Sequence, residues 1–480
     1  MNAHRRIGPA SLARLLGAWR GEGGGPAYRQ LADGLRLLIL DGRLPLDVVL
    51  PGERELAAVL EVSRTTVTAA MARLRDDGFL ERRQGAGART RLPAGPGARG
   101  GGLMALNEAE GLIDMASAAP PAADVVHAAF AAALAQLPAH LPNHGYSAVG
   151  LPVLREVIAE RYTRRGLPTT PDQIMITSGA QHALALLIRL ACGPGDRVVI
   201  DHPTYPHAID AIQRASCRPV PVGLPDEGWD VEGLAAAFRQ AGPRLAYFIA
   251  DFQNPTGRWM SPDARGAIVQ AAARARTTVI FDETLIDLWL DGPIQPYAFD
   301  ARADTVVWLG STGKSYWGGL RLGWIRADVP TIQALGPRRV SMDLGTPLLE
   351  QLAAAHLLSG DEASLVARRD MLRARRDVLI GLVRQKLPDW KVEAPPGGLS
   401  LWAELPAPVS TSLAAASERF GVRLAAGPRF GVDGAFERFL RLPYTQAPEV
   451  LADVVERLAS AYGRLRPAPA GQRPQVGTLI

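Results

Sequence analysis

Five short apolar runs, separated by helix-length segments, constrain the fold of this 480-residue chain more than any other feature. They occupy residues 173–177, 197–201, 245–250, 278–282 and 305–309. Strands that alternate with helices predict an α/β unit with a mostly parallel sheet. In such sheets ligands bind beyond the carboxyl ends of the strands, so the residues that follow each run are the candidates for a site.

The residues that follow the first four runs could together hold a phosphorylated aromatic cofactor. Tyr205 could stack on a pyridine ring, a turn presents the amide of Asn254, and the carboxylate of Asp282 could pair with a pyridinium nitrogen. Each also has an ordinary structural explanation, as a core tyrosine, a turn residue or a helix cap. A helix start suited to phosphate follows the first run, at Gly179, Ala180 and Gln181.

Lys314 follows the fifth run in a chain that has almost dispensed with lysine. Among 53 Lys plus Arg, lysine occurs only at positions 314, 386 and 391. Lysine can lose its proton and form a Schiff base with an aldehyde, which arginine cannot do. Ser311 offers a hydroxyl three residues upstream, and Arg321 offers a bidentate phosphate donor seven residues downstream. The alternative is an exposed loop lysine.

The order of these residues resembles aminotransferases with the fold of aspartate aminotransferase. The resemblance rests on S-x-x-K…G-x-R-x-G around Lys314 and on N-P-T-G at Asn254. It implies pyridoxal 5′-phosphate (PLP) as cofactor, bound covalently by Lys314, with Asp282 on the ring nitrogen and Asn254 near the 3′-oxygen. Ser311 and Arg321 would hold the phosphate. The fold implied is a mostly parallel central sheet with a smaller C-terminal α+β domain.

Two further residues enter through the same resemblance, and one expected residue is missing. Tyr146 would reach the phosphate of the partner subunit, and Arg441 would bind the α-carboxylate of a substrate or effector. A surface ion pair is the alternative for Arg441. Many relatives place a tyrosine shortly after the ring aspartate, whereas here Asp282 is followed by Glu-Thr-Leu. Thr284 is the candidate replacement.

Residues 26–92 predict a small DNA-binding unit. Two helices meet at a turn before Ser63, which is placed to cap the second helix. Residues 79–90 read as a two-stranded wing with a glycine tip. The alternative is a helical protein-interaction domain with solvated arginines. Side chains that would project from the first turns of the second helix toward the major groove are Arg64, Thr65, Thr66 and Thr68.

The run L-P-x-E-R-E-L-A…V-S-R-T-T-V resembles the winged helix of GntR-type bacterial regulators over residues 27–92. Gly52 stands where that family often has Ser, which could remove one helix cap. By the resemblance, DNA contacts would also come from Arg54 and from the wing residues Arg82, Arg83 and Gly85.

The complete layout resembles the MocR subfamily of bacterial regulators. Residues 1–25 would form an N-terminal extension with a short docking helix, 93–112 a flexible Gly/Pro-rich linker, 113–466 the aminotransferase-like domain and 467–480 a disordered tail. The resemblance implies a homodimer that binds a double-stranded DNA operator and senses an amino acid, an amine or a vitamin B6 compound. Alternatives are a catalytically active aminotransferase that carries a DNA-binding domain, and a DNA-binding protein whose large domain only dimerises.

Composition limits the remaining function classes. The net charge of +5 and the pI near 9.4 are compatible with nucleic acid. No run of 18 apolar residues predicts a membrane span, and no secretory leader precedes the two cysteines, Cys192 and Cys217. We therefore expect a cytoplasmic protein with reduced core thiols and without a metal site.

Overall fold

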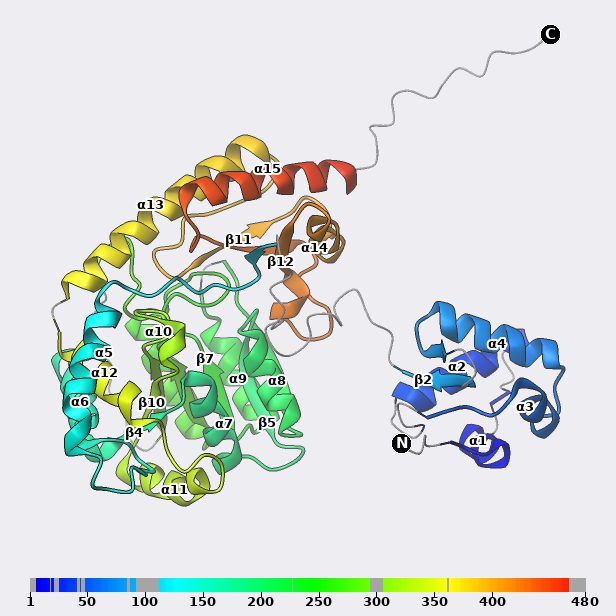
Figure 1. Ribbon diagram of the computed structural model, residues 1–480, viewed down its shortest axis with the longest axis horizontal. Coiled ribbons are helices and arrows are strands. Elements are labelled where there is room, and N and C mark those ends of the chain that lie inside the picture. The colour runs from blue at the N-terminus through cyan, green and yellow to red at the C-terminus, as the bar shows by residue number, and fades with distance from the viewer. Residues whose placement is uncertain are drawn as a thin grey trace, which may run out of the picture. The chain divides into compact units, whose positions relative to one another are not determined.

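The computed structural model describes residues 6–17, 19–20, 26–40, 44, 48–83, 87–91, 112–226, 228–293, 305–360 and 362–465. The chain divides into two compact units, Met1–Asn107 and Glu108–Ile480 (Figure 1). The predicted linker up to residue 111, the wing tip at Gly85 and the tail 467–480 lie outside the described residues.

The N-terminal unit is a winged helix, as the sequence predicted. Its strands pair antiparallel, with Leu80 opposite Thr90. Leu12 of the first helix is fully buried in the same apolar cluster as Leu31, Leu35 and Val67, so this helix is part of the core of the unit. The elements are α1 (Pro9–Leu16), α2 (Ala27–Leu40), α3 (Glu53–Val59), α4 (Arg64–Asp76), β1 (Leu80–Arg83) and β2 (Gly87–Thr90).

Side-chain hydrogen bonds fix where α3 and α4 begin and how they lie together. Ser63 Oγ accepts from the backbone N–H of Thr66 at 3.1 Å, which confirms Ser63 as the N-cap of α4. Gly52 offers α3 no side-chain cap, but Glu55 accepts from the Gly52 N–H at 3.2 Å. Thr68 Oγ1 donates to Glu53 Oε2 at 2.7 Å and thereby ties α4 to α3.

The large unit is built on a seven-stranded sheet in which β10 alone runs antiparallel to its neighbours. All five predicted runs are strands of this sheet. Two strands were not predicted: β10 is short, and β6 carries Pro219 and Pro221, which a sheet tolerates because β6 lies at its edge. In spatial order the strands are β4 (Ile174–Thr177), β10 (Gly323–Arg326), β9 (Val306–Ser311), β8 (Thr278–Asp282), β7 (Leu245–Phe248), β5 (Arg197–His202) and β6 (Arg218–Gly223).

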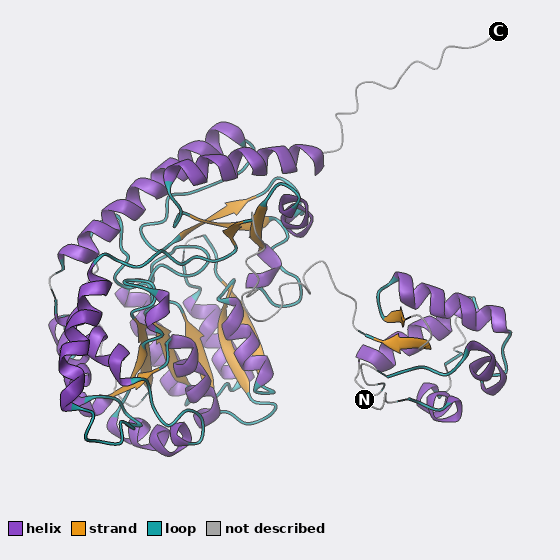
Figure 2. Cartoon of the chain, viewed as in Figure 1, coloured by secondary structure: helices purple, strands orange, loops and turns teal. Residues whose placement is uncertain are grey.

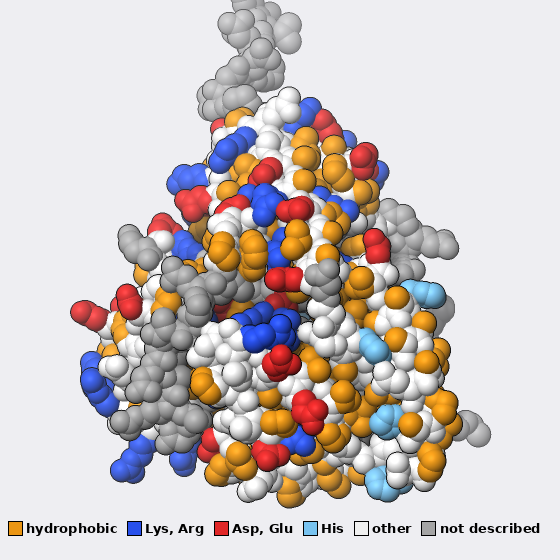
Figure 3. All heavy atoms as spheres, turned by 90° about the vertical axis from the view of Figure 1, so that its left-hand side faces the viewer, with side chains coloured by type: hydrophobic (Ala, Val, Ile, Leu, Met, Phe, Trp, Pro, Cys, Tyr) orange, Lys and Arg blue, Asp and Glu red, His pale blue; other side chains and the backbone are white. Residues whose placement is uncertain are grey.

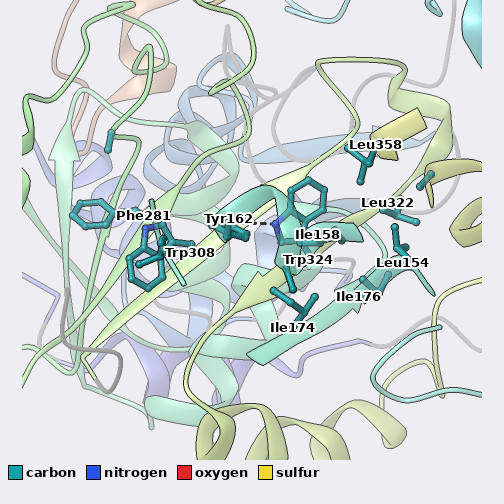
Figure 4. Packing of buried hydrophobic residues seen from close by; sticks show 14 of the residues in the cluster. Leu154, Ile158, Tyr162, Ile174, Ile176, Phe281, Trp308, Leu322, Trp324 and Leu358 are labelled. Atoms are coloured by element: carbon teal, nitrogen blue, oxygen red, sulfur yellow. Dashed lines mark hydrogen bonds between the residues drawn. The ribbon is translucent and has the colours of Figure 1, made fainter. Parts of the chain in front are cut away.

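Helices cover both faces of this sheet (Figure 2). One face carries α5 (Val125–Gln136), α6 (Pro152–Arg164), α9 (Val231–Ala241), α10 (Pro262–Arg274) and α12 (Leu348–Ser359). The other carries α7 (Ala180–Ala191), α8 (Pro206–Arg214) and α11 (Val329–Val340). Figure 4 shows the first core, in which Trp324 of β10 donates to the hydroxyl of Tyr162 of α6 at 3.1 Å. Both cysteines are free thiols, and Cys217 is buried.

A second, smaller sheet confirms the predicted C-terminal α+β domain. Its order is β11 (Ser400–Glu404), β13 (Phe439–Pro443), β12 (Val422–Ala426) and β3 (Ile113–Met115). The helices α13 (Ala363–Lys386), α14 (Ser410–Glu418) and α15 (Pro448–Leu465) share its core. Short 3-10 helices are η1 (Leu137–Ala139), η2 (Pro171–Gln173), η3 (Gly318–Leu320) and η4 (Gly427–Phe430).

The edge strand of this small sheet comes from the start of the large unit. β3 pairs parallel with β12, and the Ile113 N–H donates to the oxygen of Gly421 at 2.8 Å. The chain then crosses from the small sheet to α5 on the large one. In the described residues, no helix is long and apolar enough to cross a membrane.

The N-cap of α4 gives a first test of this fold. Ser63→Ala removes the acceptor for the Thr66 N–H and should lower the free energy of opening of α4 by about 0.5–2 kcal/mol, whereas Ser63→Gly should cost only a few tenths, about 0.3 kcal/mol. The measurement is hydrogen exchange of the α4 amides in the full chain. Equal costs for both variants would contradict the capping role.

Candidate functional site

Lys314 follows β9, and its surroundings favour the neutral amine. The half-buried ammonium donates to the oxygen of Ala118 at 2.7 Å. Burial, then the positive charges of Arg441 and Arg321, lower the pKa of Lys314 to about 8, and the charge of Asp282 opposes this in part. A neutral lysine amine is a nucleophile toward carbonyl compounds, so the lowered pKa of Lys314 is consistent with the imine chemistry predicted from the sequence.

Asp282 ends β8 and is 8% exposed. Its Oδ2 accepts from the hydroxyl of Tyr247 at 2.6 Å, and its Oδ1 accepts from both the N–H and the hydroxyl of Thr284 at 2.9 and 2.5 Å. Burial raises the pKa of Asp282, while these hydrogen bonds oppose the rise. Thr284, the candidate replacement for the missing tyrosine, therefore serves the carboxylate itself.

The start of α7 and Arg321 lie together, and we call this pair the candidate anion site. Arg321 Nη2 donates to the oxygen of Ser178 at 3.3 Å. Gly179 caps α7 at φ +95°, and a Cβ there would lie 3.0 Å from Arg321 Nη2. A Cβ on Gly323 would lie 2.7 Å from the backbone nitrogen of Ala180. Both glycines thus allow the guanidinium and the helix start to approach each other, where N–H groups and a cation favour phosphate.

Two residues predicted to bind the cofactor, Ser311 and Gln181, lie beside this candidate anion site and differ in their hydrogen bonding. Ser311 Oγ donates to the oxygen of Leu322 at 2.9 Å and accepts from the Gly313 N–H at 3.0 Å. Gln181 Nε2 donates to the oxygen of His207 at 3.0 Å, while its buried Oε1 has no hydrogen-bond partner among the described residues. The hydroxyl of Ser311 therefore shapes the loop that leads to Lys314.

Arg441, on β13, is a buried cation that meets Asn254. Its Nη1 donates to Asn254 Oδ1 at 3.2 Å, its Nη2 donates to the oxygen of Ala116, and its guanidinium lies 4.9 Å from the ring centroid of Phe430. It is 6% exposed, and its Nε has no hydrogen-bond partner within the part of the chain that the structure describes. Burial lowers the pKa of Arg441 to about 10. A buried cation with a spare donor is suited to an anionic ligand.

Tyr205 joins this cluster, whereas Tyr146 lies on the surface. Burial, then the charge of Asp282, raise the pKa of Tyr205 to about 12, and the positive charges of Arg441 and Arg321 act in the opposite sense. Tyr146 is 66% exposed and stacks on His144 with ring centroids 5.8 Å apart. Its ring is accessible to a second subunit.

The predicted DNA-contacting residues of the winged helix are mostly exposed. Arg54 of α3 is exposed, as are Ser63, Arg64 and Thr65 at the start of α4. Thr66 and Thr68 are half-buried, and the hydroxyl of Thr68 donates to Glu53 of α3, so Thr68 braces the two helices. Arg82 and Arg83 lie in β1 of the wing. Within the described residues, no group of three or more His, Cys, Asp or Glu could hold a metal ion.

Two contributions to the site were missed by sequence reasoning. Tyr247 lies within the apolar run of β7, where a tyrosine reads as a core residue. The oxygens of Ala116 and Ala118 accept from Arg441 and Lys314, but backbone groups leave no trace in residue types.

Comparisons with family models match both units. Residues 110–458 match the family described as aminotransferase class I and II. Residues 27–89 match the family described as bacterial regulatory proteins, gntR family.

Individual relatives divide between regulators and enzymes. The HTH-type transcriptional regulator YisV of Bacillus subtilis is 28% identical over 88% of this chain and 93% of that protein. The 2-aminoadipate transaminase of Thermus thermophilus is 29% identical over 67% of this chain and 80% of that protein. Among solved structures, the α-aminoadipate aminotransferase LysN of Thermus thermophilus, complexed with N-(5′-phosphopyridoxyl)-L-leucine, gives a TM-score of 0.69 at 26% identity, covering 77% of this chain and 96% of that one.

The charge arrangement around Lys314 predicts its titration. In protein labelled with ¹³C-lysine, the Lys314 signal, assigned through its loss in Lys314→Arg, should titrate near pH 8. Arg441→Met removes a positive charge, so it should raise the pKa of Lys314 toward the ordinary 10.5, and Arg321→Met should do the same more weakly. A pKa for Lys314 near 10.5 in the unmodified chain would contradict this account of the site.

Proposed function

We propose that this chain, which belongs to the aminotransferase class I and II family and carries a gntR-family DNA-binding domain, is a transcription regulator whose large unit binds PLP and senses an amino acid, an amine or a vitamin B6 compound. The observation that carries the proposal is that one chain holds both a capped helix that exposes Arg64 and a buried cluster in which the pKa of Lys314 is lowered to about 8.

The donor set fits PLP. Its phosphate would bind where Arg321 meets the start of α7, at Gly179, Ala180 and Gln181, which lie close together. Lys314 would bind the cofactor covalently, and Asp282 would pair with its ring nitrogen. Tyr205, Asn254 and Ser311 would complete the set. When bound, PLP supplies an aldehyde that reacts with amines and a ring that withdraws electrons.

The residues around the cofactor site would select the effector and hold its charges. Arg441 would orient a carboxylate, because its guanidinium is buried and its Nε donates no hydrogen bond to any described residue. Tyr247 and Thr284 would hold Asp282 in place as an anion, since each donates a hydrogen bond to its carboxylate. Lys314, neutral in part near pH 8, would take up and release protons as ligands exchange.

The partners of the chain would be a double-stranded operator and a second copy of the chain, in the cytoplasm. Arg54, Arg64 and the wing arginines Arg82 and Arg83 would contact DNA. The large unit carries charged and exposed hydrophobic side chains together on one face (Figure 3). Exposed apolar residues in or after α5 support a homodimer that brings Tyr146 to the partner's site: Leu134, Leu141 and Tyr146 itself.

A working aminotransferase is the second candidate, and a specific observation favours it. Lys314, Asp282 and Arg441 act on one another or on shared neighbours within one cluster, which leaves transamination chemically available. An assay of amino-group transfer from α-amino acids to 2-oxo acids separates the candidates. Turnover without any effect of ligands on DNA binding would favour the enzyme.

The first prediction from the proposal concerns the cofactor bond. Borohydride reduction of the PLP-loaded protein should fix the cofactor on Lys314, as peptide mass mapping can show among only three lysines. Lys314→Ala should lose the adduct and retain the fold. An adduct on Lys386 or Lys391 would refute the site assignment.

The second prediction concerns DNA. On an operator selected from random duplexes with the full-length chain, Arg64→Ala should weaken binding by about 1–3 kcal/mol in every condition, if Arg64 contacts a base edge. PLP or an effector should shift operator affinity by about 5–150-fold in the unmodified chain, since a typical coupling is about 1–3 kcal/mol.

Two variants separate the DNA contact from the sensor. Lys314→Ala should bind DNA but lose the response to PLP. Arg441→Ala should lose the response only to effectors that carry a carboxylate. The same operator affinity with and without ligands in the unmodified chain would show that the large unit is not a sensor.

A further inference from the structure

Three cationic side chains hold the backbone oxygens of one short segment, residues 116–121, which we call the strap. They come from three different elements: β13, the loop after β9, and α13. The hydrogen bonds run from Arg441 Nη2 to Ala116, from Lys314 Nζ to Ala118 at 2.7 Å, and from Arg368 Nη2 to Pro121 at 2.9 Å.

Two of these cations are the groups that the proposed ligands would use. An aldehyde that reacts with Lys314 consumes N–H donors of Nζ, and a carboxylate on Arg441 competes with the oxygen of Ala116 for the guanidinium. The strap and the ligands therefore require the same donors. Charged donors make stronger hydrogen bonds than neutral ones, so the competition involves substantial free energy on both sides.

The third cation, Arg368, has a different position. Its Nη2 also donates to the oxygen of Tyr316 at 3.2 Å, two residues after Lys314, and the N–H of Ala123 donates to the same oxygen at 3.0 Å. Arg368 is 6% exposed, and its buried Nη1 has no hydrogen-bond partner among the described residues. It thus joins the C-terminal end of the strap to the loop that carries Lys314.

We propose that Arg368 is a positioning residue that holds the strap on the Lys314 loop, and that the strap competes with PLP and carboxylate ligands for Lys314 and Arg441. The identity of these ligands rests on the proposed function. The strap directly follows β3, the edge strand at which the chain arrives from the N-terminal unit. Release of the strap therefore changes the segment that directly follows β3 on the covalent route between the two units.

The competition predicts that a mutation which removes Arg368 strengthens ligand binding instead of weakening it. If the strap must leave before ligands bind, the measured affinity is the intrinsic affinity reduced by the fraction of molecules in which the strap is released. A weaker clamp increases that fraction, so loss of Arg368 strengthens ligand binding. Damage to a merely structural residue would weaken it.

The test is Arg368→Met in the full-length chain, titrated with PLP and followed by hydrogen exchange of a peptide that spans residues 112–124. Affinity for PLP should rise about two- to tenfold, the equivalent of one hydrogen bond. Without ligand, the Ala116 and Ala123 amides should exchange faster in Arg368→Met than in the unmodified chain. Binding of PLP to the unmodified chain should increase their exchange in the same way. Arg373→Met is the matched control, since Arg373 lies on the same helix and donates to the oxygen of Leu290 at 2.7 Å. It should change neither quantity.

Weaker PLP binding by Arg368→Met, with strap exchange unchanged, would overturn the inference. So would unchanged strap exchange in an unmodified chain that forms the Lys314 adduct. If the unmodified chain takes up no PLP, the proposed function fails, and the strap is tested without ligand: Lys314→Ala and Arg368→Met must each speed exchange of the strap. If Arg368→Met does not fold, Arg368→Lys gives the same test, because an ammonium cannot reproduce the planar guanidinium that bridges Pro121 and Tyr316.

Discussion

An excess of positive charge at the carboxyl edge of the large sheet governs the site. The positive charges of Arg441 and Arg321 act on Lys314, and Asp282 is the acid that opposes them there. Because such interactions are stronger away from water, the cluster keeps the amine of Lys314 partly neutral near pH 8 and leaves Arg441 in need of an anion. The predicted nucleophile, Lys314, and the predicted carboxylate-binding residue, Arg441, thus belong to one excess of positive charge.

The direction of the strands brings these charged side chains together. Parallel strands end at one edge, so side chains far apart in the sequence, such as Asp282 and Lys314, come together without any local signal that they should. This is why the five apolar runs were enough to predict five strands of the sheet and to put Asp282 and Lys314 at the same edge of it. Strands that depart from the pattern escaped prediction: the proline-containing β6 at an edge, the short antiparallel β10, and β3, which joins a sheet far along the chain.

Sequence reasoning also failed where function depends on backbone atoms or on ambiguous residue types. Tyr247 reads as core because it lies in an apolar strand, yet its hydroxyl donates to Asp282. The strap has an alanine- and proline-rich sequence that suggests nothing, and its oxygens are what Lys314 and Arg441 contact. In the winged helix the N-cap Ser63 was predictable from local chemistry, whereas the Thr68–Glu53 bond required the packing of α3 on α4.

A sensor must prefer one of two arrangements when its ligand binds. In the large unit these arrangements are the strap held by Lys314 and Arg441, and the strap released. Either the strap oxygens or a ligand can satisfy the donors of Lys314 and Arg441, and a buried cation cannot go without both. Thermodynamic reciprocity then requires that whatever biases the strap from the N-terminal side changes ligand affinity by the same factor. An enzyme that only turned over substrates would need no such connection, whereas a regulator gains from one that begins at the strand leading to its DNA-binding unit.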